Sequence, residues 1–258
     1  MTPFVARASE SLHWYGRDGS PQYSVTAKNG NQRPTTLADA RKMGLVPSVT
    51  TIMQSAAKPG LEAWKLNQML LAALTLPRAE NETEDSYVQR IVRDSKEQGR
   101  AAAERGTAVH EALEQWYEGI MYRDYYEHQM GTAAEVEKVF GSPEWACEKS
   151  FAHELGFGGK IDLSHLEGDG AVIDFKTKEF TDPKEVTGFD EHVMQLAAYR
   201  VGIKKPKARC ANVFVSVTVP GLAVVKEWTQ EEIERGWNMF NALRTFWYAK
   251  SGLELVKN

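Results

Sequence analysis

The stretch from residue 157 to residue 178 constrains the fold of this chain more than any other part of the sequence. Two apolar strand patterns flank the turn-forming sequence Glu167-Gly168-Asp169-Gly170, which predicts a β-hairpin. Asp162 ends the first pattern, Asp174 ends the second, and Lys176 follows two residues later. Because alternate residues of a strand share a face, Asp174 and Lys176 are expected to point the same way. The hairpin should therefore bring two carboxylates and one ammonium together.

Carboxylates that converge beside a lysine are typical of a site for a hard divalent cation. Mg²⁺ or Mn²⁺ on carboxylate oxygens polarises a phosphoryl oxygen, lowers the pKa of a bound water and shields the charge of a phosphodiester. Lys176 would orient the attacking water or stabilise the charge that develops at phosphorus. The alternative is a surface hairpin whose charges are merely solvated. The apolar runs beside both acids favour the metal site.

The spacing of Asp162, Asp174 and Lys176 resembles the PD-(D/E)XK nuclease superfamily, and the flanking motifs resemble its RecB-like branch. The segment Arg105-Gly106-Thr107-Ala108-Val109-His110 is similar to the helix that supplies the metal-binding histidine of that branch. Cys147-Glu148-Lys149-Ser150-Phe151 is similar to the strand before the first acid, and Gln195-Leu196-Ala197-Ala198-Tyr199 matches the Q-x-x-x-Y motif. The resemblance covers roughly residues 100 to 228.

This resemblance implies an α/β fold with a mixed central β-sheet flanked by helices, as in restriction endonucleases, and an N-terminal helical elaboration. Residues 101–258 would form the nuclease core. Residues 1–100 would form a hairpin and a helical subdomain that serves as a candidate DNA-end cap.

The resemblance also implies roles for individual residues. The catalytic residues would be Asp162, Asp174 and Lys176. The metal ligands would be His110, Asp162, Asp174 and the carbonyl of Phe175, with Glu114 as a weaker candidate for a second metal. The residues that contact or support the substrate would be Arg105, Glu148, Lys178, Gln195, Tyr199 and Arg200.

The expected activity is that of a divalent-metal-dependent deoxyribonuclease. The segments Pro47-Ser48-Val49-Thr50-Thr51-Ile52 and Lys58-Pro59-Gly60-Leu61 resemble phage-type exonucleases, which favours an exonuclease of phage or bacterial DNA recombination, repair or degradation. Two alternatives are a structure-selective or sequence-specific endonuclease and a catalytically silent DNA-binding or assembly module. DNA is the expected partner. A recombination partner protein and a homo-oligomer are left open.

Composition is that of a globular protein, with 258 residues, 42% hydrophobic residues and 26% charged residues. We expect a cytoplasmic protein without a membrane partner, because the start lacks a signal-peptide pattern and apolar runs such as Met69–Leu74 fall short of the roughly 20 residues of a membrane span. Cys147 and Cys210 are too few to ligate a four-cysteine iron–sulfur cluster. The net charge of −4 does not exclude DNA, because phosphate contacts depend on local patches.

Two local clusters of basic residues are candidate DNA tracks. The first comprises Arg200, Lys204, Lys205, Lys207, Arg209 and Lys226, and the second comprises Arg90, Arg93, Lys96, Arg100 and Arg105.

Sequence signals also predict the order of the elements. An initial hairpin is expected from residues 11–15 and 22–26, followed by helices that begin after Thr35 or Thr36, after Ser48 and at Pro59. Two helices are expected between residues 84 and 118, the second with His110 directed inward. Strands are then expected at 145–153, 157–164, 171–178, 210–219 and 222–228, with helices at 191–202 and after Thr229.

Overall fold

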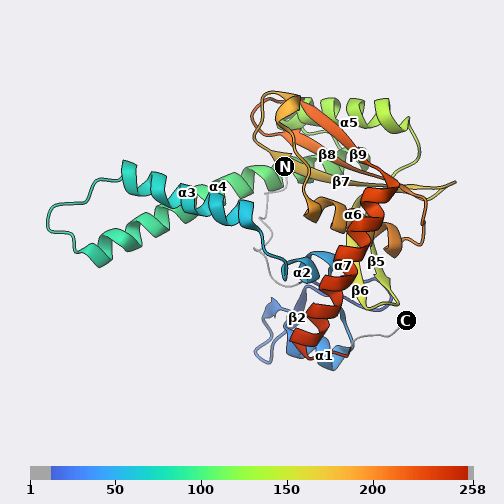
Figure 1. Ribbon diagram of the computed structural model, residues 1–258, viewed down its shortest axis with the longest axis horizontal. Coiled ribbons are helices and arrows are strands. Elements are labelled where there is room, and N and C mark those ends of the chain that lie inside the picture. Colours follow the sequence, from blue (N-terminus) through green and yellow to red (C-terminus); the bar gives the residue numbers. More distant parts are fainter. Residues whose placement is uncertain (1–12, 255–258) are drawn as a thin grey trace. The chain divides into compact units, whose positions relative to one another are not determined.

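The computed structural model describes residues 13–254, and its largest sheet has five strands in the order β5-β6-β7-β8-β9 (Figure 1). All neighbouring strands in this sheet are antiparallel except β7 and β8, which are parallel. The mixed sheet flanked by helices confirms the predicted α/β class. The strands are β5 (Ala146–His153), β6 (Phe157–His165), β7 (Ala171–Lys178), β8 (Arg209–Ser216) and β9 (Ala223–Trp228).

The predicted hairpin is the pair β6 and β7. Gly168 and Gly170 in its turn have φ angles of 55° and 82°, which glycine adopts without the steric cost of a side chain. Pairing of the two strands runs from the turn to Leu163 and Ile173. Asp162 and Asp174 were expected at strand ends, but both strands continue past them. The two acids instead lie next to the last paired residues, Asp162 just before Leu163 and Asp174 just after Ile173.

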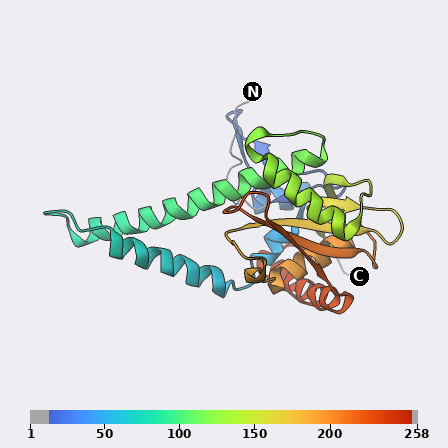
Figure 2. The same cartoon turned by 90° about the horizontal axis from the view of Figure 1, so that it is seen from above.

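Helices cover both faces of the sheet (Figure 2). One face is covered by α6 (Asp190–Gly202) and α7 (Gln230–Ser251), whose buried side chains share one apolar core with β6 and β7. The two helices pack closely at Gly236, where a Cβ atom would lie only 2.7 Å from the carbonyl oxygen of Val193. The other face carries α5 (Tyr126–Phe140), which packs on β8 and β9.

The N-terminal segment contains small strands and two short helices. The helix α1 (Leu37–Met43) is capped by Thr36 and α2 (Val49–Met53) by Ser48, as predicted. The predicted initial hairpin is reduced to one antiparallel bridge between Tyr15 and Pro21, beside which the Gln22 N–H donates to the Trp14 carbonyl. Otherwise each of its two strands pairs with a later one. The pairs are β1 (Trp14–Tyr15) with β4 (Val46–Pro47), and β2 (Ser24–Thr26) with β3 (Gln32–Pro34). Residues 11 and 12 of that prediction lie outside the described part.

The chain divides into two compact units, residues 57–109 and the remainder. This division differs from the expected boundary at residue 100, because the N-terminal segment belongs to the same unit as the sheet. Within that unit, α2 packs on α6 and α7, and β1 and β4 contact β6. Residues 13–56 are therefore part of the unit that contains the sheet.

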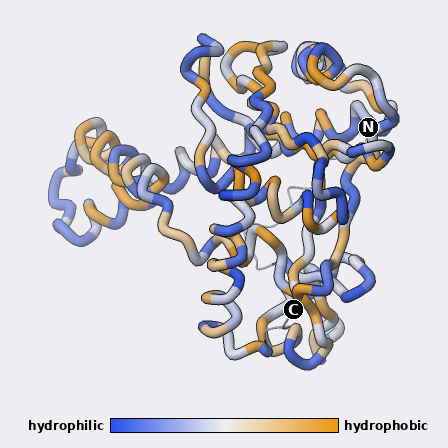
Figure 3. The backbone as a smooth tube through the Cα atoms, turned by 45° about the vertical axis from the view of Figure 1, so that its right-hand side comes forward, coloured by the Kyte–Doolittle hydropathy of each residue, from blue (hydrophilic) through white to orange (hydrophobic). Residues whose placement is uncertain are grey.

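The unit of residues 57–109 is a pair of helices. Its first helix is α3 (Pro59–Thr75), with the predicted proline in its first turn, and its second belongs to α4 (Glu84–Tyr117). The Tyr87 hydroxyl donates to the Leu76 carbonyl over 2.7 Å and fastens one helix to the other. The two helices expected between residues 84 and 118 are one, since no proline interrupts the pattern. The connection between α3 and α4 is hydrophilic (Figure 3).

Two single-turn 3₁₀ helices complete the described elements, at Arg123–Tyr125 and Pro183–Glu185. None of the helices within residues 13–254 is long and apolar enough to cross a membrane.

Candidate metal centre

His110 lies in the last two turns of α4, between two carboxylates. Its Nδ1 is 2.8 Å from Oε1 of Glu114 on the same helix, and its Nε2 is 3.1 Å from Oδ2 of Asp162 on β6. The spacing of four residues between His110 and Glu114 places both side chains on one face of the helix. One ligand atom from each of the three residues lies within 4.8 Å of the others. These three side chains form the candidate metal centre.

Opposing effects set the charges of this centre. Burial alone would lower the pKa of His110, but the carboxylates of Asp162 and Glu114 outweigh it and raise the pKa to about 10. Burial would raise the pKa of Asp162, but His110, Lys176 and a backbone N–H hold it below its ordinary value. Both shifts favour the charged forms, an imidazolium beside a carboxylate.

Phe175 fixes the positions of Asp162 and His110. Its backbone N–H donates to Oδ2 of Asp162 over 2.7 Å. Its ring meets the His110 ring edge to face at 6.0 Å between centroids and stacks on Tyr117 at 6.2 Å. The alternation of β7 thus directs Phe175 toward α4, while its neighbours serve a different cluster. The role expected for the Phe175 carbonyl as a metal ligand stays a prediction.

Asp174 and Lys176 start a chain of polar contacts that reaches α6. The Lys176 Nζ lies 2.6 Å from Oδ2 of Asp174 and donates to Oε1 of Gln195 over 3.0 Å. The Gln195 amide in turn donates to the Tyr199 hydroxyl over 2.9 Å. A carboxylate on β7 and an amide on α6 therefore hold the lysine ammonium in place. The predicted shared face of Asp174 and Lys176 is confirmed.

Asn212 on β8 is a further residue of the candidate site that the sequence analysis did not identify. Its amide donates to Oδ2 of Asp174 over 2.7 Å, and its Oδ1 accepts from the indole N–H of Trp228 over 2.8 Å. A polar residue inside the apolar run from Cys210 to Val219 was the available signal. Asn212 orients the Asp174 carboxylate, because buried polar groups keep their hydrogen bonds.

Burial also shifts the pKa values of Asp174 and Tyr199, the two ends of this series of polar contacts. It raises the pKa of Asp174; Lys176 opposes the rise and the nearby Asp162 adds to it. Burial also raises the pKa of Tyr199 well above its ordinary value, so this phenol stays protonated. Tyr199 can therefore act as a hydrogen-bond donor and acceptor, but not as a base.

The donor set fits the expected divalent cation. His110, Glu114 and Asp162 supply one imidazole nitrogen and carboxylate oxygens, which are ligands of Mn²⁺ and Mg²⁺. Asp174, which was expected among the ligands, does not belong to this three-residue group, and its Oδ2 contacts Lys176 and Asn212. Glu114, which was expected to be a weaker candidate, belongs to the group and is buried.

The remaining expected substrate residues are dispersed. Glu148 has a φ of 53° and forms an ion pair with Lys160, and its Oε1 has no hydrogen-bond partner among the described residues. Lys178 lies 5.9 Å from the centre of the Phe189 ring. Arg105 is exposed and belongs to the unit of residues 57–109. Gln195 contacts the lysine of the site directly, and Tyr199 is connected to it through Gln195.

The buried position of Arg200 differs from the expected surface position. This arginine was expected to be a surface residue beside Gln195 and Tyr199, but only 6% of its surface is exposed and its guanidinium donates to Gln230. Arg209 is also engaged, with both carboxylate oxygens of Glu227. Lys204, Lys207 and Arg209 of this cluster are exposed, and Arg209 is the one of these three that pairs with Glu227. The first basic cluster is therefore a smaller candidate DNA surface than the sequence suggested.

Comparisons with known proteins give little further information. No protein-family model matches the chain, and no curated protein is significantly similar to it. The chain is similar to a solved structure described as "Crystal structure of SSO0001", with 15% sequence identity over 71% of this chain and 86% of that chain, and a TM-score of 0.32. A likeness at that TM-score carries no argument about function, which is inferred below from the side chains of the site.

Proposed function

We propose that this protein is a divalent-metal-dependent deoxyribonuclease of the PD-(D/E)XK type. One observation carries the proposal: Asp162, which pairs with His110, lies on β6 beside Asp174 and Lys176 on β7, and the Phe175 N–H links the two strands at this point. These are the residues on which the sequence resemblance rests. A solvated surface hairpin does not account for their burial, because Asp162 and Asp174 are 7% and 2% exposed.

The roles of the residues follow from their contacts. Asp162, with His110 and Glu114, would hold a Mn²⁺ or Mg²⁺ ion, which when bound polarises a phosphoryl oxygen and lowers the pKa of a water. Asp174 and Gln195 hold the Lys176 ammonium in one place. From there it can orient the attacking water or stabilise charge on the phosphate oxygens. The buried Tyr199 hydroxyl keeps Gln195 oriented toward the lysine.

Cleavage of DNA should require a divalent metal. We expect no cleavage in excess chelator and restored cleavage on addition of Mn²⁺ or Mg²⁺, with Mn²⁺ at least as effective because imidazole is a better ligand for it. Time courses on linear duplex and single-stranded DNA measure this. Ca²⁺ serves as a control ion that occupies oxygen sites with a larger and looser geometry. Full activity in chelator would rule out a metal-dependent mechanism.

The mode of attack should be exonucleolytic. The resemblance of residues 47–61 to phage-type exonucleases leads us to expect that end-labelled linear DNA is shortened while covalently closed circular DNA survives. Product lengths followed in time on both substrates test this. Rapid linearisation of the circle would establish the endonuclease alternative. Binding to both forms without cleavage in the presence of Mn²⁺ would favour the catalytically silent DNA-binding module.

A further inference from the structure

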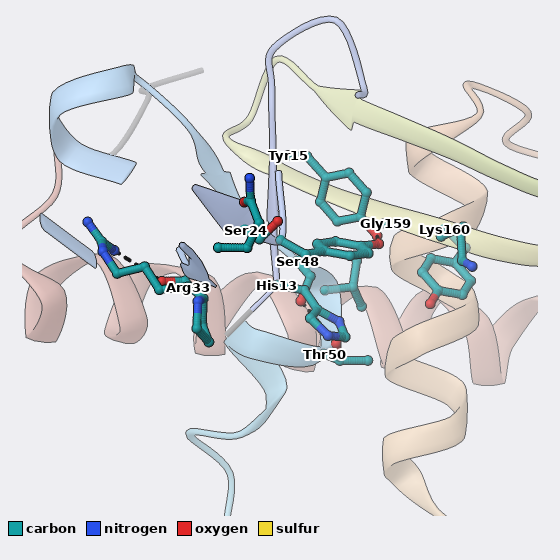
Figure 4. Close-up of a pocket in the computed structure, with 13 residues that line it drawn as sticks. His13, Tyr15, Ser24, Arg33, Ser48, Thr50, Gly159 and Lys160 are labelled. Atoms are coloured by element: carbon teal, nitrogen blue, oxygen red, sulfur yellow. Dashed lines mark hydrogen bonds between the residues drawn. The ribbon is translucent and has the colours of Figure 1, made fainter. Parts of the chain in front are cut away.

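A cavity of about 610 Å³ opens beside β6 in the same unit as the candidate metal centre (Figure 4). None of the residues of the metal centre lines it. It is formed by the N-terminal segment on one side and by β6 and α6 on the other. Its lining includes His13, Tyr15, Tyr23, Arg33, Lys160 and Tyr199.

Aromatic rings form a preorganised wall of this cavity. The rings of His13 and Tyr23 are stacked, with centroids 4.5 Å apart and an angle of 29° between their planes. Tyr15 meets Tyr23 edge to face, and the two tyrosine hydroxyls are 2.7 Å apart. The backbone N–H of His13 is held by the Thr51 hydroxyl over 3.1 Å. A flat ring can stack on such a wall without a large cost in conformational entropy.

The polar groups of the cavity suit an anion. Arg33 and Lys160 line it, and no acidic residue is among the described side chains that do so. Both cations have carboxylate partners elsewhere, Asp39 and Glu148, which orient them. Hydroxyl and amide groups are contributed by Ser24, Gln32, Ser48 and Thr50. Aromatic walls, two cations and neutral hydrogen-bonding groups are together the chemistry that recognises a nucleotide.

Two connections join this cavity to the metal centre. Lys160 in the cavity and Asp162 in the centre are two residues apart on β6, a distance of about 6.7 Å along a strand. Tyr199 lines the cavity and accepts the hydrogen bond of Gln195, which holds Lys176. Even at the rise of about 3.4 Å per nucleotide of stacked duplex DNA, such a distance spans no more than two nucleotides, and an extended single strand covers it with fewer.

We propose that this cavity holds one unpaired nucleotide of the DNA strand that is being cleaved, with its base against the His13–Tyr23 wall. The proposal rests on the nuclease function proposed above and specifies its substrate, a strand that is single-stranded at the point of cleavage. A base inside a duplex is stacked and paired on both sides, so it cannot lie against a protein ring without leaving the helix. Single-stranded DNA or a frayed end meets this requirement at little cost.

Binding measured without cleavage tests the proposal. The probe is a fluorescein-labelled 12-nucleotide oligothymidine, titrated in chelator by fluorescence anisotropy, with a blunt G·C-rich duplex as the comparison. Tyr23→Ala should weaken binding of the single strand by about 5- to 150-fold, the range typical of losing one base–aromatic stack. Tyr23→Phe keeps the ring and should keep most of the affinity. The duplex should bind more weakly than the single strand to the wild-type protein.

A second variant tests the same aromatic wall, and a cleavage assay separates this proposal from the proposed nuclease function. His13→Ala removes the other ring of the wall but leaves the backbone contact of residue 13, so it carries the same expectation if Tyr23→Ala does not fold. Equal affinity of wild type, Tyr23→Ala and His13→Ala for the oligothymidine would overturn the proposal, as would stronger binding of the duplex. Failure of the nuclease function would appear separately, as absent cleavage with Mn²⁺ by a protein whose oligothymidine binding still depends on Tyr23.

Discussion

Replacing Lys176 with alanine should lower the turnover of DNA cleavage by about 10²- to 10⁴-fold, the range typical of a positioned proton-transfer or charge-stabilising group. The ammonium is held by Asp174 on its own strand and by Gln195 on α6, so its removal leaves both groups without the cation that they contact. His110, Glu114 and Asp162 are unchanged in this variant. Its affinity for Mn²⁺ should therefore be retained, or rise slightly because a positive charge near Asp162 is gone.

Single-turnover cleavage of an end-labelled oligonucleotide, beside a calorimetric Mn²⁺ titration, separates these effects. Lys138→Ala is the matched control, since this exposed lysine of α5 pairs only with Glu135 among the described residues. The control should cleave DNA at the wild-type rate. Near wild-type cleavage by Lys176→Ala would remove this lysine from the mechanism, and loss of Mn²⁺ binding would show that its role is structural.

The parts of the fold that the sequence predicted are those set by local interactions. The β6–β7 hairpin follows from strand alternation and a turn whose glycines need positive φ angles, and the helix starts at Thr36, Ser48 and Thr229 follow from side-chain caps. Pairing between distant strands has no such local signal. The pairing of β1 with β4 is of this kind and was not predicted. β2 instead pairs with β3 across a turn that contains Asn29-Gly30, a local hairpin signal that the sequence analysis did not use.

The candidate site likewise has features that follow from a single strand and features that depend on packing between elements. The shared direction of Asp174 and Lys176 is a property of one strand and was predictable. Glu114 lies beside His110 and Asp162, and Asn212 donates a hydrogen bond to Asp174. Both arrangements depend on how α4 and β8 pack around the hairpin. The burial of Arg200 likewise depends on α7, whose first residue Gln230 accepts its hydrogen bond. Sequence alone could not show these packing partners.

The three residues of the metal centre should contribute unequally to Mn²⁺ affinity. Asp162→Asn keeps an oxygen that can accept from the Phe175 N–H but removes the charge, so we expect affinity to fall by about 100-fold or more. Glu114→Gln should cost less, about 10- to 100-fold, if its carboxylate acts by holding Nδ1 of His110 while Nε2 faces Asp162. A carboxylate that orients a ligating histidine sets its ring direction and basicity without contributing a bond of its own.

Calorimetric Mn²⁺ titrations of the two variants rank the carboxylates, and Glu118→Gln is the control. Glu118 follows Glu114 by four residues and is exposed, so its loss removes the same charge from the same end of α4 without touching His110. The control should bind Mn²⁺ as the wild type does. If Glu114→Gln lowers affinity as much as Asp162→Asn, Glu114 is a direct ligand and the centre uses both carboxylates. If Asp162→Asn binds Mn²⁺ as the wild type does, the ion lies elsewhere, and the metal centre assigned to His110, Glu114 and Asp162 is wrong.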